Sequence, residues 1–149
     1  MRRILMAAVF AVLCNITFAQ TTVFEKYKNN KYVSTVFIGK TMLSMTQGAK
    51  IGGHDIGKLG SQIDRIRIIE CEKRSLFAAL RNHVVSDMKK NKYKVVMTAS
   101  EEDEKVIIYH KTLPGNKNDF VLLTIEDDEL AIINITGSVS LQDIRRFAD

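Results

Sequence analysis

The chain has 149 residues, a hydrophobic fraction of 46%, a charged fraction of 26% and a formal net charge of +5. These values are ordinary for a soluble globular protein, and so small an excess of positive charge gives no support to nucleic acid as a partner. The sequence contains neither a Gly-x-Ser-x-Gly elbow nor a phosphate-binding glycine loop, so we expect no cofactor and no assembled catalytic set.

The first nineteen residues have the layout of a secretory signal peptide. Arg2 and Arg3 precede an apolar run over residues 4–18, and Ala19 places a small residue before Gln20. The apolar run is too short for a stable membrane span. We therefore predict that residues 1–19 are removed and that residues 20–149 form a single domain. That domain is expected in the periplasm or cell envelope, with no transmembrane segment after cleavage.

The two cysteines are not expected to pair, because Cys14 lies inside the predicted signal. Bacterial lipoprotein signals place a small residue before the modified cysteine, and Leu13 stands there instead, which argues against a lipid anchor. Cys71 then remains as a lone thiol. We interpret it as a small buried hydrophobic residue, with a redox or nucleophilic role as the alternative.

The N-terminal half of the domain is predicted to contain a short helix at 21–28, a strand at 32–38 and a helical turn at 41–45. Residues 47–60 form a predicted loop that holds five of the eight glycines. A connection of this length is either mobile or functional. Its candidate ligand-binding residues are Gly52, Gly53, His54 and Asp55.

A second strand is predicted at 63–70, with Ile66 and Ile68 on one face and Arg65 and Arg67 on the other. The strongest helix follows at 72–91. Its apolar stripe recurs at four-residue steps and requires a sheet to cover; the stripe consists of Leu76, Leu80, Val84 and Met88.

Four further strands are predicted at 93–99, 105–111, 120–125 and 130–135. Their connections are short, which implies antiparallel neighbours. A final helix at 141–147 begins with Ser140 and Asp143 in the spacing of a capping box. The predicted fold class is therefore α+β: a mostly antiparallel sheet of five to six strands with a C-terminal meander, and helices packed mainly on one face.

The segments 120–123 and 130–133 are apolar on both faces of the predicted sheet. An antiparallel sheet with one wet face alternates apolar and polar residues instead. Either helices cover both faces, or the second face meets an envelope protein or a second copy of the chain.

Acidic residues gather in two predicted turns, at 101–104 and 127–129. Alternate turns of a meander lie at the same end of a sheet, so these carboxylates are expected at one edge. The candidate ligands for a divalent cation are Glu102, Asp103, Asp127 and Asp128, with calcium as the first choice. Neither turn has the spacing of a dedicated calcium loop, and solvated hairpin tips are the alternative interpretation.

The remaining polar motifs predict little chemistry. His54, His83 and His110 are too scattered for a zinc site. The run Lys89, Lys90, Lys92 and Lys94 indicates either a solvated helix end or a contact with anionic lipid or polysaccharide. Asn134-Ile135-Thr136 matches a glycosylation acceptor but ends an apolar strand.

Several segments together resemble a known family. They are Phe18-Ala19-Gln20, Phe24-x-x-Tyr27, the stretch 33–40, Ile66-Arg67-Ile68-Ile69, Val106-Ile107-Ile108-Tyr109 and Ile135-Thr136-Gly137. This pattern is similar to the small exported proteins grouped as domain of unknown function 4252, found mainly in Bacteroidetes. The resemblance implies an envelope location and an α+β domain. It implies no activity and supplies no catalytic residue.

We therefore expect a non-enzymatic exported protein that acts as a binding or adaptor module through protein contacts. The alternative is a small-ligand or divalent-cation binding protein that uses the loop at 47–60 or the acidic turns. A thiol enzyme built on Cys71 is the least favoured hypothesis.

Overall fold

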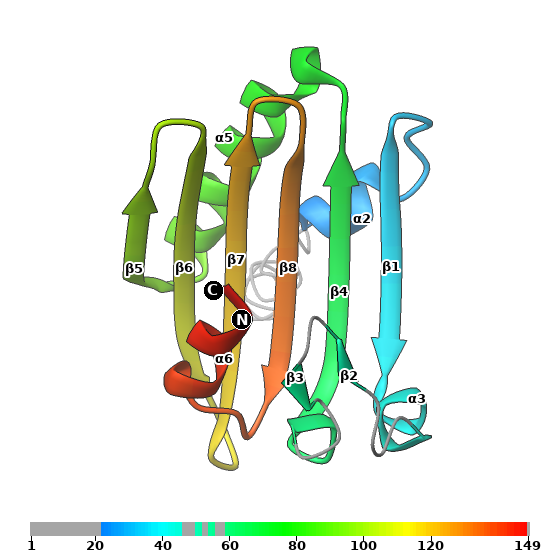
Figure 1. Ribbon diagram of the computed structural model, residues 1–149, viewed down its shortest axis with the longest axis vertical. Coiled ribbons are helices and arrows are strands. Elements are labelled where there is room, and N and C mark those ends of the chain that lie inside the picture. The colour runs from blue at the N-terminus through cyan, green and yellow to red at the C-terminus, as the bar shows by residue number, and fades with distance from the viewer. Residues whose placement is uncertain (1–21, 46–49, 52–53, 56–58, 149) are drawn as a thin grey trace, which may run out of the picture.

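The computed structural model describes residues 22–45, 50–51, 54–55 and 59–148. Its centre is one antiparallel sheet with the strand order β1-β4-β8-β7-β6-β5 (Figure 1). The strands are β1 (Val33–Gly39), β4 (Ile63–Cys71), β5 (Lys94–Ser100), β6 (Glu104–Leu113), β7 (Lys117–Glu126) and β8 (Leu130–Gly137). The predicted α+β class and the C-terminal meander are confirmed.

The strand order joins parts of the chain that are far apart in sequence. Strands β5 to β8 follow one another as a meander, and β8 then pairs with β4, whose other neighbour is β1. Strands β1 and β5 therefore form the two outer edges of the sheet. The pairing of β1 with β4 is regular over seven residues, whereas the pairing of β5 with β6 shifts register between Val95 and Met97.

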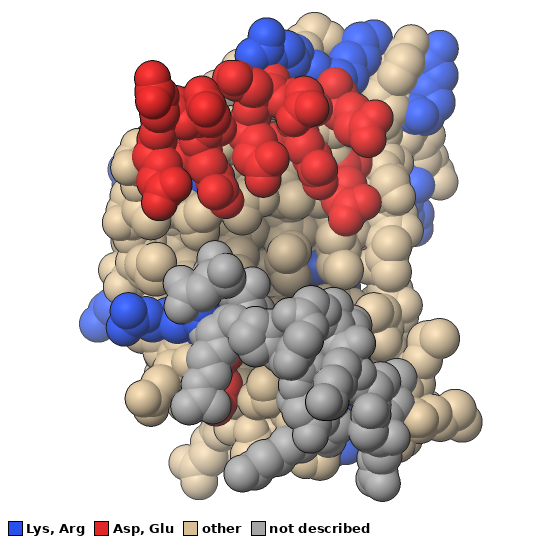
Figure 2. All heavy atoms as spheres, in the orientation of Figure 1, with Lys and Arg blue, Asp and Glu red and all other residues tan. Residues whose placement is uncertain are grey.

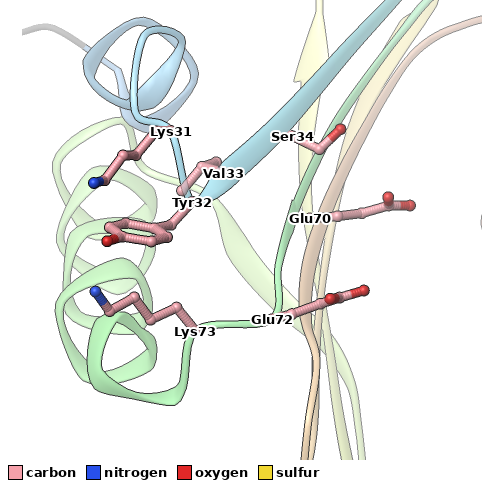
Figure 3. Close-up of a pocket in the computed structure, with 7 residues that line it drawn as sticks. All are labelled: Lys31, Tyr32, Val33, Ser34, Glu70, Glu72 and Lys73. Carbon is pink, nitrogen blue, oxygen red and sulfur yellow. The ribbon is translucent and has the colours of Figure 1, made fainter.

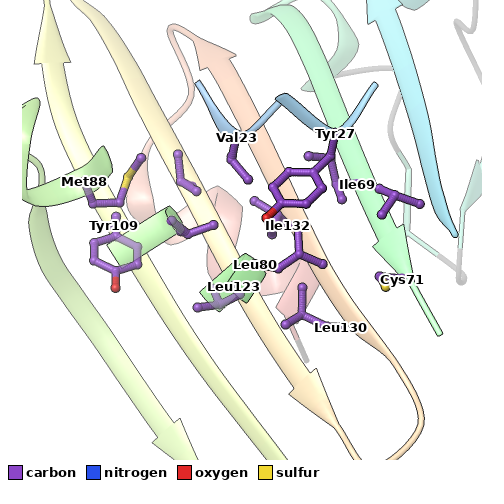
Figure 4. Packing of buried hydrophobic residues seen from close by; sticks show 13 residues of the cluster. Val23, Tyr27, Ile69, Cys71, Leu80, Met88, Tyr109, Leu123, Leu130 and Ile132 are labelled. Atoms are coloured by element: carbon purple, nitrogen blue, oxygen red, sulfur yellow. The ribbon is translucent and has the colours of Figure 1, made fainter. Parts of the chain in front are cut away.

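One face of the sheet is covered by α2 (Val23–Tyr27) and α5 (Phe77–Lys90), which lie behind the strands in Figure 1. The predicted stripe of α5 is buried at Leu80, Val84 and Met88. Figure 4 shows the helix residues Tyr27, Leu80 and Met88 gathered over strand residues that include Leu123 and Ile132. We call this face the helix side; it contains the larger of the two apolar clusters.

The opposite face carries a second apolar cluster, and α6 (Leu141–Ala148) packs across part of it. Ile144 of α6 and Val139 before it are fully buried, in one cluster with Ile108 and Phe120 of the sheet. Leu43 of α3 (Lys40–Met45) joins the same cluster. Apolar residues occur on both faces of the meander because helices contribute to a core on each side, although the longest helix lies on one side only.

The predicted start of the final helix is confirmed in detail. The backbone N–H of Asp143 donates to the Ser140 Oγ at 3.2 Å, and the Ser140 N–H donates to an oxygen of the Asp143 carboxylate at 3.2 Å. This reciprocal pair is a capping box with Asp in place of the usual Glu.

Two predictions differ from the structure: the start of the long helix and the content of the glycine-rich loop. The helix expected at 72–91 begins later, because Lys73 has an extended backbone and a short 3₁₀ turn, η1 (Arg74–Leu76), comes before α5. The predicted loop at 47–60 contains a small hairpin, in which β2 (Lys50–Ile51) pairs with β3 (His54–Asp55). The glycine content of this segment predicted only a loop, and the hairpin could not be predicted because two-residue strands are too short to show periodicity.

Candidate functional site

Two of the four residues predicted to bind a ligand in the glycine-rich loop lie within the described residues. His54 and Asp55 form β3 and pair with Ile51 and Lys50. Gly52 and Gly53 lie outside the described residues. A ligand role for these four residues therefore stays a prediction.

The predicted crowding of carboxylates at one sheet edge is present in the structure. The turn between β5 and β6 and the turn between β7 and β8 lie at the same end, and Glu104 pairs directly with Glu126. The end of β4 adds Glu70 and Glu72, which sequence analysis did not place there. Figure 2 shows this acidic edge as a band of carboxylates across one end of the sheet. Its ten members are Glu70, Glu72, Glu101, Glu102, Asp103, Glu104, Glu126, Asp127, Asp128 and Glu129.

Burial and the neighbouring carboxylates both act on Glu129 of the acidic edge. Partial burial, followed by the neighbouring charges of Glu70 and Glu126, raises the pKa of this carboxyl group. Asp127 is held by Arg74, whose guanidinium lies 3.3 Å from the Asp127 carboxylate. Across the part of the chain that the structure describes, no three His, Cys, Asp or Glu side chains are grouped so as to hold a metal ion. A cation role for Glu102, Asp103, Asp127 and Asp128 therefore stays a prediction.

A polar cluster that sequence analysis missed lies on the helix side of the sheet, and Asp119 is its centre. The Asp119 carboxylate is 5% exposed and accepts hydrogen bonds from the Tyr93 hydroxyl, from the Asn134 side chain at 2.6 Å and from the Thr136 hydroxyl at 2.7 Å. Burial and the hydrogen bond to Asp119 raise the pKa of Tyr93 well above its ordinary value. Three donors thus satisfy a carboxylate that would otherwise be costly to bury.

Arg67 is held against the same cluster by hydrogen bonds and by a ring contact. Its Nε and Nη2 both donate to the Asn134 Oδ1, at 3.0 and 2.8 Å, and its guanidinium lies 4.4 Å from the centre of the Phe24 ring. Asn134 is held in turn, because its amide group also donates to the Phe120 carbonyl at 3.0 Å. Burial, and then repulsion from Arg65, lower the pKa of Arg67. Asn134 is only 1% exposed, so the folded protein does not present it for glycosylation.

The sequence carried one signal for this cluster. Asp119 and Asn134 are polar residues at the start and in the middle of otherwise apolar strands, and such residues are paired when buried. Their partners were not visible, because Asp119 meets Thr136, and Asn134 meets Arg67, only through the register of β7, β8 and β4.

The outer edge of β1 is the most apolar exposed region of the described residues. No residue of β1 is charged, and Val36 and Phe37 are 43% and 65% exposed. Among the described residues, eight large hydrophobic side chains are exposed, and five of them belong to β1, to the residue before it or to α3 after it: Tyr32, Val36, Phe37, Met42 and Met45. We call the outer side of β1 with these residues the β1 edge.

A surface hollow of about 680 Å³ lies at the start of β1 (Figure 3). Its lining residues point to opposite sides of the sheet. Lys31, Tyr32 and Lys73 lie on the helix side, with the Lys73 ammonium 3.6 Å from the centre of the Tyr32 ring, whereas Glu70 and Glu72 point to the other side. The hollow therefore wraps around the sheet edge and is not a single enclosed ligand cavity.

The other candidate reactive groups have structural contacts. Cys71 is 1% exposed and belongs to the helix-side core, as predicted. His110 stacks on Phe120 with ring centres 4.8 Å apart and shares a hydrogen bond with Asn118. His83 contacts the edge of the Tyr27 ring.

The fold and these surfaces define an α+β protein built on an open six-stranded antiparallel sheet, with a buried polar cluster and an uncharged edge strand. Residues 27–147 match the family described as Domain of unknown function (DUF4252), and the chain belongs to this family. This confirms the family resemblance seen in the sequence. No curated protein matches the chain. Within the described residues, no helix combines the length and apolar character needed to cross a bilayer.

Proposed function

We propose that this protein is an exported, non-enzymatic binding module that associates through the β1 edge. The main support for this proposal is that β1 is a regular, uncharged and exposed edge strand. Such an edge presents unpaired backbone N–H and C=O groups and readily accepts another strand. The two apolar residues at its centre, Val36 and Phe37, give an added strand side chains to pack against.

The opposite edge of the sheet provides the contrast. Strand β5 begins with Lys94, and its pairing with β6 is interrupted by a register shift between Val95 and Met97. A charge and a bulge are two of the devices by which proteins discourage strand addition. Strand β1 itself contains neither a charged residue nor a register shift, so it is less protected against strand addition than β5.

The partner that we propose is a second copy of the chain, with the two β1 strands antiparallel about an axis at Val36. In this register Thr35 lies opposite the partner's Phe37, a combination of β-branched and aromatic residues that favours pairing. Strand β1 starts beside the acidic edge, since Val33 pairs with Cys71. An antiparallel dimer therefore places the two acidic edges at opposite ends of the joined sheet, where they do not repel each other.

The dimer is tested by sedimentation equilibrium of the purified protein and of two matched variants. Val36→Lys places two ammonium groups opposite each other at the proposed axis, and we expect a monomer. Val96→Lys alters a residue of similar exposure on β5 and is expected to leave the dimer intact. In a second test, Val36→Cys is expected to form a disulfide-linked dimer under mild oxidation, because opposite Cβ atoms in such a pair lie about 4.5–5.5 Å apart.

A wild-type protein that stays monomeric at 100 μM, or Val36→Lys and Val96→Lys variants with the same mass, would overturn the proposed dimer. Cross-linking of β1 to a different envelope protein would also overturn the choice of a second copy as partner.

Export is supported by the signal-like residues 1–19 and by the family resemblance. We propose cleavage after Ala19. The mass of the protein recovered from the envelope of its native host then corresponds to a chain that begins at Gln20, and an intact N-terminus in that fraction would contradict export by cleavage.

The non-enzymatic assignment is supported by the placement of the reactive side chains. Cys71 is buried in the core, and His83 and His110 are held by aromatic and polar neighbours.

A further inference from the structure

A small cavity lies beside the buried polar cluster. Its volume is about 150 Å³, and it is lined by α2, the C-terminal end of α5 and four strands of the sheet. Its walls combine apolar and polar side chains, including Phe24, Met88, Val121, Arg67, Tyr93, Lys111 and Asn134. This mixture of an apolar body and a few convergent polar groups is typical of a small-molecule site.

Three cationic side chains lie at or beside this cavity, and the carboxylates of Asp87 and Asp119 lie near them. Arg67 and Lys111 line it, and Arg65 lies on the same face of β4 two residues away, yet none of the three forms an ion pair within the described residues. The Asp119 carboxylate accepts hydrogen bonds from three uncharged donors, and its charge acts on Arg67 without a direct ion pair. Asp87 also lines the cavity, but one of its oxygens accepts the Val23 backbone N–H at 2.9 Å and the other faces His83.

Arg67 is pre-positioned but has unused hydrogen-bonding capacity. Its Nε and Nη2 donate to Asn134, and no described residue accepts a hydrogen bond from its Nη1. The stacking on Phe24 and the anchored Asn134 hold the guanidinium plane. An arginine fixed in this way is suited to carboxylate recognition, because little rotamer freedom is left to lose on binding.

Two buried side-chain atoms of the described residues have no hydrogen-bond partner, and both belong to this part of the molecule. They are the Thr22 Oγ1, whose residue lines the cavity, and the Arg65 Nε. Buried polar atoms are nearly always paired, so each of these two atoms can accept or donate a hydrogen bond to a bound water or ligand.

We propose that this cavity binds a small organic anion with one carboxylate group. Arg67 and Lys111 contact the carboxylate, and the short apolar body lies against Phe24 and Val121. A water molecule occupies about 30 Å³ in the liquid, so the cavity has room for about five waters, which fits a carboxylate of two to five carbon atoms. The site is separate from the β1 edge, and its test uses none of the residues that test the dimer.

The probe is butyrate, titrated into the purified protein at constant ionic strength while melting temperature and ¹H–¹⁵N NMR spectra are recorded. Ligand that binds only the folded state raises the melting temperature. We expect a rise of several degrees at 20 mM butyrate and shifts of the Arg67 Nε–H and Asn134 side-chain amide signals. Butyramide, which has the same shape without the charge, is expected to do neither.

The variant is Lys111→Gln. In the described structure the Lys111 ammonium has no hydrogen bond or ion pair, and it lies 5.5 Å from the centre of the Tyr93 ring, so its loss leaves Asn134 and Arg67 in place. We expect butyrate to bind it at least five-fold more weakly. Lys105→Gln is the matched control: it removes the same charge from the same face of β6, and we expect less than a two-fold change.

Three results would overturn the proposal. The first is the absence of any shift up to 50 mM butyrate. The second is equal binding of butyramide, and the third is equal weakening in the two lysine variants. Binding of inorganic phosphate in place of butyrate would refute the carboxylate assignment.

Discussion

Gly137 is the position at which a single added methyl group should be most damaging. It lies in β8 opposite Ile63, where β4 shifts register before Arg65. The Gln62 carbonyl lies directly beside Gly137 and accepts a hydrogen bond from the Ser138 N–H at 2.8 Å. A Cβ atom built on Gly137 would lie 2.2 Å from that carbonyl oxygen and 2.8 Å from the Ile63 Cα.

The size of the effect follows from these contacts. Real Cβ atoms essentially never come closer than 3.0 Å to another heavy atom, so alanine at this position requires β4 and β8 to separate by about 0.8 Å. The obstructing atoms are backbone, and relief by a change of rotamer is not available. Overpacking of this kind costs about 1–3 kcal/mol, and we expect the upper end for Gly137→Ala.

The assay is urea and thermal unfolding of the purified protein, with Gly39→Ala as the control. A Cβ at Gly39 meets only the Phe37 ring, at 3.4 Å, so we expect that variant to stay within about 0.5 kcal/mol of wild type. About 3 kcal/mol corresponds to a melting temperature roughly 10 °C lower for a domain of this size. A loss below about 1 kcal/mol in Gly137→Ala, or equal losses in the two variants, would refute the close approach of Gln62 to Gly137.

Three other changes test different parts of the structure. Leu80→Ala removes a fully buried side chain from α5 and should cost about 3 kcal/mol in urea unfolding, whereas Val85→Ala, at a position that is 40% exposed, should cost less than about 1 kcal/mol. Because the pKa of Tyr93 is raised above its ordinary 10.0, its contribution to stability is present below pH 10 and is lost as the pH rises further. The slope of unfolding free energy against pH should therefore be shallower above pH 10 in Tyr93→Phe than in wild type. Glu129→Gln should raise the melting temperature at pH 7 by about 1–3 °C, because it removes a carboxylate that is partly buried and is repelled by its neighbours. Added 0.5 M NaCl should shrink the part of the gain that comes from repulsion, and an unchanged gain in salt would argue against charge repulsion.

Local patterns in the sequence were sufficient to predict most of the helices and strands. The four-residue stripe at Leu80, Val84 and Met88 predicts α5, and the Ser140–Asp143 spacing predicts the start of α6. Short connections predict the antiparallel meander and bring the two acidic turns to one end of the sheet. Each of these features depends on residues close together in the chain, because helix periodicity, capping and hairpin closure act over a few residues.

How β1 and β4 join the meander could be seen only in the tertiary structure, and both proposed sites depend on this strand order. Alternation placed Arg65 and Arg67 on one face of a strand, but only the pairing of β4 with β8 brings Arg67 to Asn134. The same arrangement leaves β1 as an outer edge. Strand order and register arise from the combined packing of residues distant in the chain, and no local pattern of one strand records which strand will lie beside it.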